Sequence, residues 1–447
     1  MIRTASTAEQ VESGKVARQA MGRKELAEHG AGDDRPDPVE LLYASDAGRD
    51  VELLPLKYER MAVSPFTFYR GFAAMHAYDL SRGQNTGLTV QLCGDMHLSN
   101  LGVYASPERN LVFDVNDFDE TLPGPFEWDL KRLVTSFEVM GRTRGFSSSV
   151  TASAVRQVAE SYRVRMGEFA EMNHVSVWYD RMDQETLETM ATSFDPKRGR
   201  KTVDARLAKA RGKTHARAAA KLTEVVDGRR RFRSEPPLLA PVDLSSDEFV
   251  ALDGVFERYR ATLSADRDHL LSRYRIIDLA RKVVGVGSVG TRCWVLLMEG
   301  RTPEDLLVLQ AKETGPSVLE PYLRKSVYRH RGRRVVEGQR LTQAASDIFL
   351  GWANGIDQSR HYYVRQLHDM KGSVDPDKMP ATTMRPYAEL CGMGLARAHA
   401  RAGGATMIAT YLGSSDKVDR ALTEYAVSYA DQNERDFAAF TAARKTS

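Results

Sequence analysis

GDMHLSN, residues 94–100, brings a carboxylate and a carboxamide into one short loop. Asp95 and Asn100 stand in this loop directly after a predicted strand, LTVQLC at 88–93. A carboxylate can take the proton of a hydroxyl group and an Asn oxygen can bind Mg²⁺, so this spacing suits phosphoryl transfer. We expect His97 to brace the loop through its backbone. The alternative is a polar turn in which both side chains only bind backbone groups.

A second polar segment, NDFDE at 116–120, follows at a distance that fits a metal site. The predicted strand LVFDV (111–115) brings Asp117 beside Asn100, and Asp119 lies two residues further on. Carboxylates interleaved with buried-type residues fit an anchored cation site better than an exposed acidic turn. The carboxylates in question are Asp114, Asp117, Asp119 and Glu120. The sequence therefore predicts that Asn100, Asp117 and Asp119 bind magnesium.

A glycine-rich segment, GVGSVG at 285–290, lies far downstream. A dinucleotide site requires a helix directly after such a segment, but TRCWVLLMEG (291–300) has the composition of a strand. A strand, a glycine turn and a second strand are the geometry in which backbone N–H groups cover nucleotide phosphates. A plain hairpin that tolerates glycine is the alternative. The residues expected to contact the nucleotide are Gly285, Gly287, Ser288 and Gly290.

Lys312, in LVLQAKE, lies on a predicted alternating strand and is expected to reach the α- and β-phosphates of the nucleotide. The alternative is an ordinary lysine at a strand end. A lysine in this role needs a carboxylate partner on the next helix. Glu337 in RVVEGQR is the preferred partner, and Glu320 in SVLEPYL is the second candidate, since it can equally complete a capping box begun by Ser317.

The bulk composition is that of a globular protein with more than one lobe. Of 447 residues, 42% are hydrophobic and 28% charged, and the net charge of +3 does not indicate a polyanionic partner. Cys93, Cys293 and Cys391 share no metal-ligand spacing and suit a reducing compartment. Because no segment resembles a signal peptide or a membrane span, we expect a cytoplasmic protein without a membrane partner.

Changes of pattern along the chain predict an α+β protein in four segments. Residues 1–60 form a polar, helical N-terminal segment, 61–280 a helical lobe that carries both polar loops, 281–375 a small α/β lobe, and 376–447 a helical return. The predicted helices are 64–80, 150–172, 334–352, 383–403 and 418–444. The predicted strands are 88–93, 111–115, 282–300, 305–313 and 361–372.

Two basic features have more than one interpretation. The stretch 197–233 is a candidate for binding an anionic substrate or nucleic acid. It contains one aromatic residue, Phe232, and its basic residues have helical spacing, so an exposed helix face is preferred and nucleic acid is disfavoured as a partner. Arg70, in FYRG, reaches a phosphate in one interpretation and is a surface or core-paired arginine in the other.

The order of motifs resembles a known group of enzymes. DxHxxN, DFD and Trp-Asp-Leu (128–130) are similar to the catalytic loop, metal loop and following helix of aminoglycoside-phosphotransferase-type kinases. Longer strings resemble the bacterial family labelled DUF2252, over roughly residues 40–440. This family is of uncharacterised function and is grouped by similarity with the kinase-like fold. The strings are SPFTFYRG, GDMHLSNLG, FDVNDFDE, WDLKRL, RVVEGQRLTQAASDIFLGW and YYVRQLHDMKGS.

The resemblance implies a role for each matching residue. Asp95 is implied as the catalytic base, Asn100 and Asp117 as magnesium ligands, and Lys312 as a phosphate ligand. Asp129 is implied as a buried brace for the catalytic loop, which is a structural role.

Three departures from the kinase pattern stand out. Asp119 occupies the position where glycine normally follows Asp-Phe, and Arg292 stands where a valine is expected, which puts the adenine contact there in doubt. The glycine-rich lobe also follows the catalytic loop instead of preceding it. Reading 282–403 before 64–275 restores the usual order, so a circularly permuted, two-lobed kinase-like fold is predicted. The alternative is that one of the two constellations is accidental.

The expected activity is magnesium-dependent transfer of the ATP γ-phosphate to a hydroxyl group, with a small molecule as acceptor. AMP transfer on the same fold and a nucleotide-binding regulatory pseudokinase are the alternatives. The sequence identifies neither the acceptor nor the oligomeric state. It does require Asp95, Asn100, Asp117 and Lys312 to converge, since metal-bridged phosphates would link them.

Overall fold

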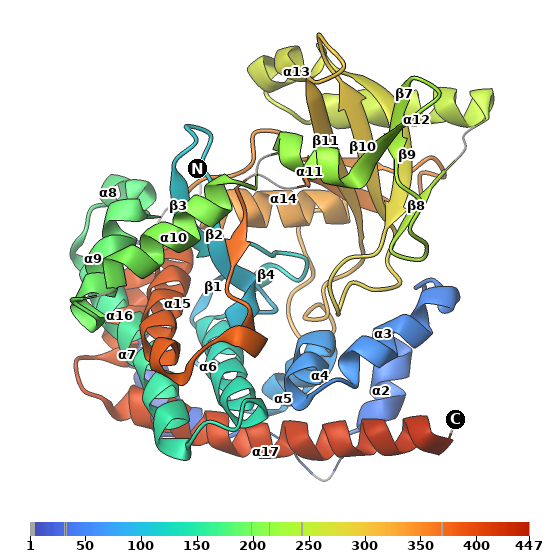
Figure 1. The fold of residues 1–447 in the computed structure, drawn as a ribbon. Helices are drawn as coiled ribbons and strands as arrows, with labels where there is room; N and C mark the ends of the chain where they lie inside the picture. Colours follow the sequence, from blue (N-terminus) through green and yellow to red (C-terminus); the bar gives the residue numbers. More distant parts are fainter. Residues whose placement is uncertain are drawn as a thin grey trace.

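The computed structural model describes residues 5–446 except residues 31, 33, 198, 214, 243, 244, 368 and 369. Helices and antiparallel sheets are mixed along the chain, which confirms the predicted α+β class. A six-stranded sheet with short helices around it stands on a larger helical layer, and the long helix α17 runs along the opposite side of that layer (Figure 1).

The helices are α1 (Thr7–Ala20), α2 (Pro38–Ser45), α3 (Leu54–Met61), α4 (Pro65–Gly71), α5 (Ala73–Arg82), α6 (Phe126–Thr143), α7 (Ser148–Glu171), α8 (His174–Tyr179), α9 (Gln184–Phe194), α10 (Gly199–Arg211), α11 (His215–Leu222), α12 (Ser246–Arg260), α13 (Ala265–Leu271), α14 (Arg331–Thr342), α15 (Ala381–Arg401), α16 (Ala405–Leu412) and α17 (Lys417–Thr446). The strands are β1 (Thr89–Leu92), β2 (Leu101–Ala105), β3 (Leu111–Val115), β4 (Leu122–Pro125), β5 (Met182–Asp183), β6 (Thr223–Val226), β7 (Arg229–Phe232), β8 (Leu239–Pro241), β9 (Arg275–Lys282), β10 (Cys293–Glu299), β11 (Leu306–Thr314), β12 (Gly351–Asn354), β13 (His361–Gln366) and β14 (Gly372–Ser373).

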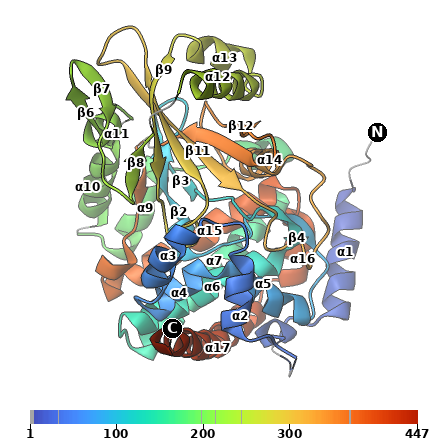
Figure 2. The same cartoon turned by 90° about the vertical axis from the view of Figure 1, so that its right-hand side faces the viewer.

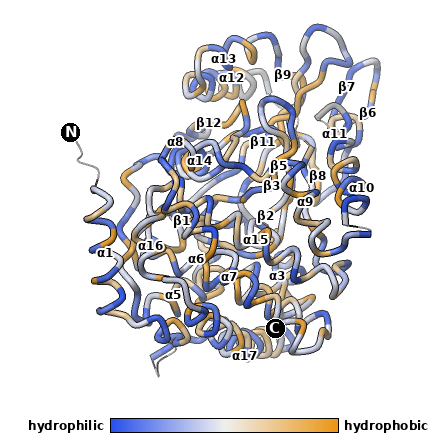
Figure 3. The backbone as a smooth tube through the Cα atoms, turned by 90° about the vertical axis from the view of Figure 1, so that its left-hand side faces the viewer, coloured by the Kyte–Doolittle hydropathy of each residue, from blue (hydrophilic) through white to orange (hydrophobic). Residues whose placement is uncertain are grey.

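The helical layer is centred on α6. Every residue of α6 from Phe126 to Gly141 is buried, as expected of a helix that neighbours cover on all sides. α7, α15 and α17 pack around it. Figure 3 shows hydrophobic and hydrophilic residues mixed along the outer helix α1. Among the described helices, none combines the length and apolar character needed to cross a bilayer.

The upper sheet has the strand order β12-β13-β11-β10-β9-β8, and each neighbouring pair is antiparallel. α14 connects β11 to β12. Phe256 and Tyr259 of α12 pack on one face of the sheet, and Ala219 of α11 with Phe232 of β7 pack on the other. The sheet takes in β8 and β9, so it begins earlier in the chain than residue 281, where the predicted small lobe starts.

Two smaller sheets carry the polar loops. β1 pairs with β4, and the order β14-β2-β3-β5 forms a separate four-stranded sheet. The predicted strands 88–93 and 111–115 appear as β1 and β3. The short hairpin partner β2, which the sequence analysis did not predict, lies directly after the 94–100 loop and pairs with β3.

Some predicted elements differ from those observed. The predicted helix 64–80 is two helices, α4 and α5, because the backbone at Phe72 leaves the helical region (φ −133°, ψ 60°). The prediction of one helical face for 197–233 is wrong at its end, since β6 and β7 form a hairpin there. Asp227 and Gly228 both have positive φ (50° and 74°), as a two-residue hairpin turn requires.

The N-terminal segment lies against the glycine-rich segment, which joins β9 to β10 as a strand–turn–strand unit. α2, α3 and α4 lie on the helical side, close to the lower ends of β8 and β9 in both views (Figures 1 and 2). Asp50, between α2 and α3, donates its N–H to the Gly290 carbonyl at 2.8 Å.

Candidate functional site

A cleft of about 410 Å³ lies between the helical layer and the upper sheet. Its walls come from distant parts of the chain: the loop after β1, the loop after β3, the glycine-rich segment, the end of β11 and the α2–α5 region. The predicted site residues that line it are Asp95, Asn100, Asp117, Asp119, Gly285, Gly287, Ser288 and Lys312. Gly290 and Glu337 do not line it.

The loop after β1 is held in place by a buried carboxylate. Asp129, near the start of α6, accepts hydrogen bonds from the N–H groups of Cys93 (2.6 Å) and Gly94 (2.9 Å). His399 of α15 contacts the same carboxylate at 3.2 Å. Gly94 has φ +90°, and a Cβ there would stand 2.2 Å from the carbonyl oxygen of Glu120. Only glycine fits this turn, and the turn aims the next residue into the cleft.

Asp95 forms a close ion pair at the base of the cleft. Arg132 of α6 donates its Nε–H to Asp95 Oδ1 at 2.5 Å. Burial raises the pKa of Asp95 to about 7, although Arg132 pulls it down. Burial also lowers the pKa of His97 well below its ordinary value, so this ring is neutral beside Asp95. Asp95 is therefore a carboxylate whose proton affinity suits exchange near neutral pH.

Asn100 is oriented by the loop itself. Its Nδ2 donates to the Asp95 carbonyl at 2.8 Å, which fixes the carboxamide plane. Within the described part of the chain, no donor binds Asn100 Oδ1, so this oxygen is left for a ligand. Tyr387 of α15 donates to the Leu98 carbonyl at 2.6 Å and ties the loop to the helical layer.

Asp117 is the carboxylate best prepared for a cation. Burial alone would raise its pKa, but Lys312, Arg365 and Lys371 hold the pKa below the usual range, so Asp117 is ionised. One of its oxygens accepts the Asp119 N–H at 3.3 Å.

The structure brings Lys312 to Asp119. Lys312 Nζ binds Asp119 Oδ2 directly, and Tyr363 of β13 donates to Asp119 Oδ1 at 2.8 Å. The preferred partner Glu337 is not used; it lies 3.5 Å from Arg333 on its own helix. Arg334 of α14 contacts the loop after β3 instead.

Arg334 donates to the carbonyls of Thr121 (2.7 Å) and Asp119 (2.8 Å). The second candidate partner, Glu320, makes no hydrogen bond or ion pair with Lys312 among the described residues. The loop after β3 is therefore held by Arg334 of α14, while Asp119 of the same loop pairs with Lys312.

Oxygen donors in this cleft suit a hard cation. Asn100 and Asp117 each present an oxygen, and Asp119 is shared with Lys312. No group of three or more His, Cys, Asp or Glu side chains is arranged as a metal cage in the described ranges. An ion such as Mg²⁺ needs only one or two protein carboxylates when substrate phosphates and water complete its shell.

The glycine-rich segment is clamped through its carbonyl groups. Arg49 donates to the carbonyls of Gly287 and Val289, both at 2.7 Å, and Arg60 donates to the Gly285 carbonyl at 2.6 Å. Gly285 and Gly290 have positive φ (68° and 90°).

The amide groups of the same segment are available. Within the described part of the chain, no backbone acceptor is bound by the N–H groups of Val286, Gly287, Ser288 or Gly290. Since the carbonyls are taken by arginines, these N–H groups are left for an anion, in the manner of a backbone nest.

Several residues of the site were not predicted from the sequence. Arg132 stands within the WDLKRL string and Arg49 at the end of a turn-rich stretch, but their partners are far away in sequence. Arg70, for which the sequence left a phosphate ligand and a surface or core-paired arginine as alternatives, lines the cleft, and burial lowers its pKa against the attraction of Asp95 and Asp117. It forms no ion pair within 4.0 Å among the described residues, and its buried Nε has no hydrogen-bond partner. A bound phosphate would give the Arg70 guanidinium both a hydrogen-bond acceptor and an opposite charge.

Comparison with known proteins places most of the chain in one family. The family profile described as "Uncharacterized protein conserved in bacteria (DUF2252)" matches residues 49–443. No curated protein and no solved structure matches the chain.

Proposed function

Since this chain belongs to the DUF2252 family, whose description names no activity, we propose from its cleft that it is an ATP- and magnesium-dependent phosphotransferase with a circularly permuted kinase-like fold. The acceptor is a hydroxyl group on a small molecule. The reaction would take place in the cytoplasm, where ATP and magnesium are available.

The order of elements around the cleft supports this proposal. In protein kinases a glycine-rich loop covers the phosphates, the lysine lies on the third strand, and a helix follows it. Here the glycine-rich segment joins β9 to β10, Lys312 lies on β11, and α14 follows. The catalytic and metal loops come from the earlier part of the chain, on the helical side of the cleft.

The observation that carries the proposal is the pairing of Lys312 with the metal loop. The two partners are 193 residues apart in sequence, yet Lys312 binds Asp119 while Asp117 and Asn100 face the same cleft. A lysine, backbone amides and two oxygen ligands in one cleft match what a triphosphate with Mg²⁺ requires.

Each side chain then has a defined task. Asp95 takes the proton of the acceptor hydroxyl, whose oxygen forms a bond to the γ-phosphorus as the bond from that phosphorus to the bridging oxygen of ADP breaks. Lys312, Arg70 and the glycine-loop amides hold the phosphates. Magnesium supplies charge neutralisation when bound at Asn100 and Asp117.

The test uses ATP carrying label in either the γ- or the α-phosphate, incubated with a panel of hydroxyl-bearing metabolites. We expect γ-label on an acceptor with the wild-type protein and none with Asp95→Asn. Transfer of α-label would mean AMP transfer instead. Absence of Mg-ATP binding in calorimetry would remove the basis of the proposal.

A further inference from the structure

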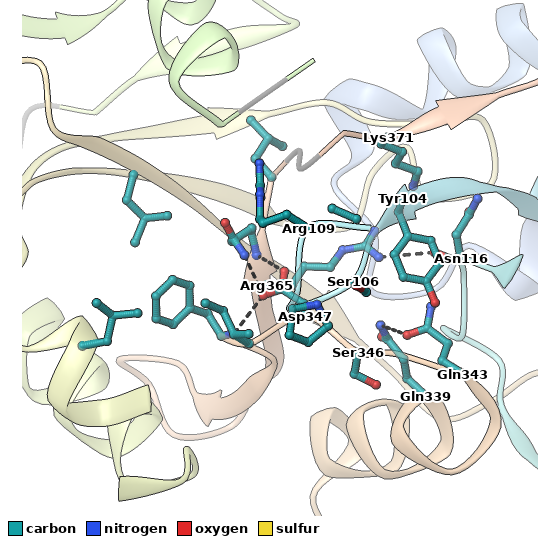
Figure 4. Close-up of a pocket in the computed structure, with 18 of the residues that line it drawn as sticks. Tyr104, Ser106, Arg109, Asn116, Gln339, Gln343, Ser346, Asp347, Arg365 and Lys371 are labelled. Carbon is teal, nitrogen blue, oxygen red and sulfur yellow. Dashed lines mark hydrogen bonds between the residues drawn. The ribbon is translucent and has the colours of Figure 1, made fainter. Parts of the chain in front are cut away.

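A second pocket, of about 340 Å³, lies at the end of β13. It is enclosed by the β2–β3 hairpin, the C-terminal end of α14, the segment before β12 and the end of β13 (Figure 4). It shares no lining residue with the cleft. A pocket of this size holds a small metabolite.

Two cations that line this pocket, Arg365 and Lys371, form no ion pair among the described residues. Arg365 of β13 reaches toward Asn116 and donates one hydrogen bond to its carbonyl, at 3.3 Å (Figure 4). Lys371, directly before β14, makes no hydrogen bond among the described residues. Within the described residues, neither has a carboxylate oxygen within 4.0 Å. A guanidinium group carries five N–H donors, so most of the hydrogen-bonding capacity of Arg365 is unused.

The single acid of the lining does not neutralise them. Asp347 already accepts the N–H groups of Phe349 (2.8 Å) and Gln366 (2.7 Å), and the Gln366 side chain at 3.1 Å. These are neutral donors, so the carboxylate is held by hydrogen bonds and makes no direct ion pair with Arg365 or Lys371 among the described residues. Exposed Arg109 adds a third positive charge to the lining.

A buried side-chain amide in the same pocket has no hydrogen-bond acceptor among the described residues. Asn116 lines the pocket with 8% of its surface exposed, and its Nδ2 has no hydrogen-bond partner among the described residues. Leaving such a group unpaired costs stability, so a ligand with oxygen acceptors would be favoured there. Burial and the nearby Arg365 lower the pKa of Lys371 to about 8, against the attraction of Asp117.

We propose that this pocket is a separate binding site for a small anion, a metabolite with a phosphate or carboxylate group seated between Arg365 and Lys371. Such a group accepts hydrogen bonds from both cations and from Asn116, and its negative charge pairs directly with Arg365 and Lys371. The pocket shares no lining residue with the cleft, although Arg365 and Lys371 also act on Asp117, so anion binding is tested without nucleotide or Mg²⁺.

The test measures anion binding to the full-length protein without nucleotide or Mg²⁺. Sodium phosphate and sodium succinate are compared with sodium chloride at equal ionic strength, by thermal unfolding and by calorimetry. We expect at least one of the two anions to raise the Tm and to bind. Phosphate alone would indicate a phosphate-bearing ligand, and succinate alone a carboxylate-bearing one.

Variants locate the bound anion. Lys371→Met should weaken anion binding at least about tenfold, since it removes a charged hydrogen bond, while Lys371→Arg should retain binding. Lys378→Met, which alters an exposed lysine of the same segment, is the matched control and should bind like the wild type. Ser346→Phe fills the pocket without changing its charge and should also abolish binding. The Tm of each variant in chloride verifies folding.

Three outcomes would overturn the proposal. The first is no binding of either anion. The second is equal binding by the wild type, Lys371→Met and Ser346→Phe. The third is binding that survives Lys371→Met but is lost in Lys312→Met, because the anion would then occupy the glycine-loop cleft.

Discussion

Arg132 and Asp95 form an ion pair, with Arg132 Nε 2.5 Å from Asp95 Oδ1, at the position where the proposed reaction needs a base. Arg132 is held by further contacts, since it also donates to the Tyr69 carbonyl at 2.9 Å and lies over the Tyr69 ring at 4.2 Å. The arginine therefore restricts the rotation of the carboxylate and counteracts the effect of burial on its pKa.

The first prediction concerns pH. A base must be ionised, and burial raises the pKa of Asp95 to about 7, so ATP turnover should fall as the pH drops below about 7. Removing a nearby cation raises a carboxyl pKa, so Arg132→Met should move this acid limb to higher pH by about one unit. The pH profile of slow ATP hydrolysis, with water as acceptor, measures both. Arg142→Met, on the same helix but paired with Glu138 and Asp431, is the control. An acid limb that stays in place in Arg132→Met would contradict the assignment.

The second prediction concerns the metal. Asp117 is ionised in the cleft, so Asp117→Asn should weaken Mg-ATP binding about tenfold or more while leaving metal-free ATP binding nearly unchanged. Calorimetry with and without Mg²⁺ separates the two. Asp204→Asn, at an exposed position of α10, should have no effect. Equal loss of ATP binding with and without metal would show that Asp117 does not act through the cation.

The third prediction concerns stability. The side chains of Lys312 and Asp119 are 6% and 23% exposed, and breaking a largely buried pair leaves a charge without its partner. Lys312→Met should lower the free energy of unfolding by about 2–3 kcal/mol in urea.

The pH dependence of this pair has a definite sign. Burial would lower the pKa of Lys312, but Asp119, Tyr363 and Asp117 raise it above the ordinary value. The contribution of Lys312 is therefore present at neutral pH and is lost only as the pH rises above about 10. In a double-mutant cycle, Lys312→Met combined with Asp119→Asn should cost less than the sum of the single changes. Additive costs would mean that the two side chains do not interact.

The fourth prediction concerns the glycine loop. Arg49 holds two of its carbonyls, so Arg49→Ala should speed hydrogen exchange of the Val289 amide, which donates to the Val286 carbonyl at 3.3 Å, and weaken ATP binding several-fold. Mass spectrometry of exchange measures the first effect and calorimetry the second. Arg420→Ala removes an arginine that pairs with Asp416 on the surface and serves as the control. Unchanged exchange in Arg49→Ala would show that the loop is held by its own backbone.

The parts of the fold that were predicted have local causes. β1, β3, α7 and α15 follow from hydrophobic periodicity, and the Asp95–Asn100 loop closes on itself because its partners are five residues apart. The β6–β7 hairpin also had a local signal, the Asp227-Gly228 turn, which the basic composition of the stretch obscured.

The parts that were missed depend on contacts between distant segments. Nothing in the sequence near Lys312 distinguishes Glu337 from Asp119 as its partner, because the choice depends on which face α14 turns toward the metal loop. The arginine clamp on the glycine segment likewise joins residues 238 positions apart.

The sequence by itself determined the residue types, their local loops and the mixed α+β class, since these depend on short-range propensity and hydrogen bonding. Only the tertiary structure decided that Asp95, Asn100, Asp117 and Lys312 line one cleft and that Asp119 pairs with the lysine. The physical reason is that a buried charge is satisfied by whichever partner packing brings within reach, and packing joins segments without regard to their distance along the chain.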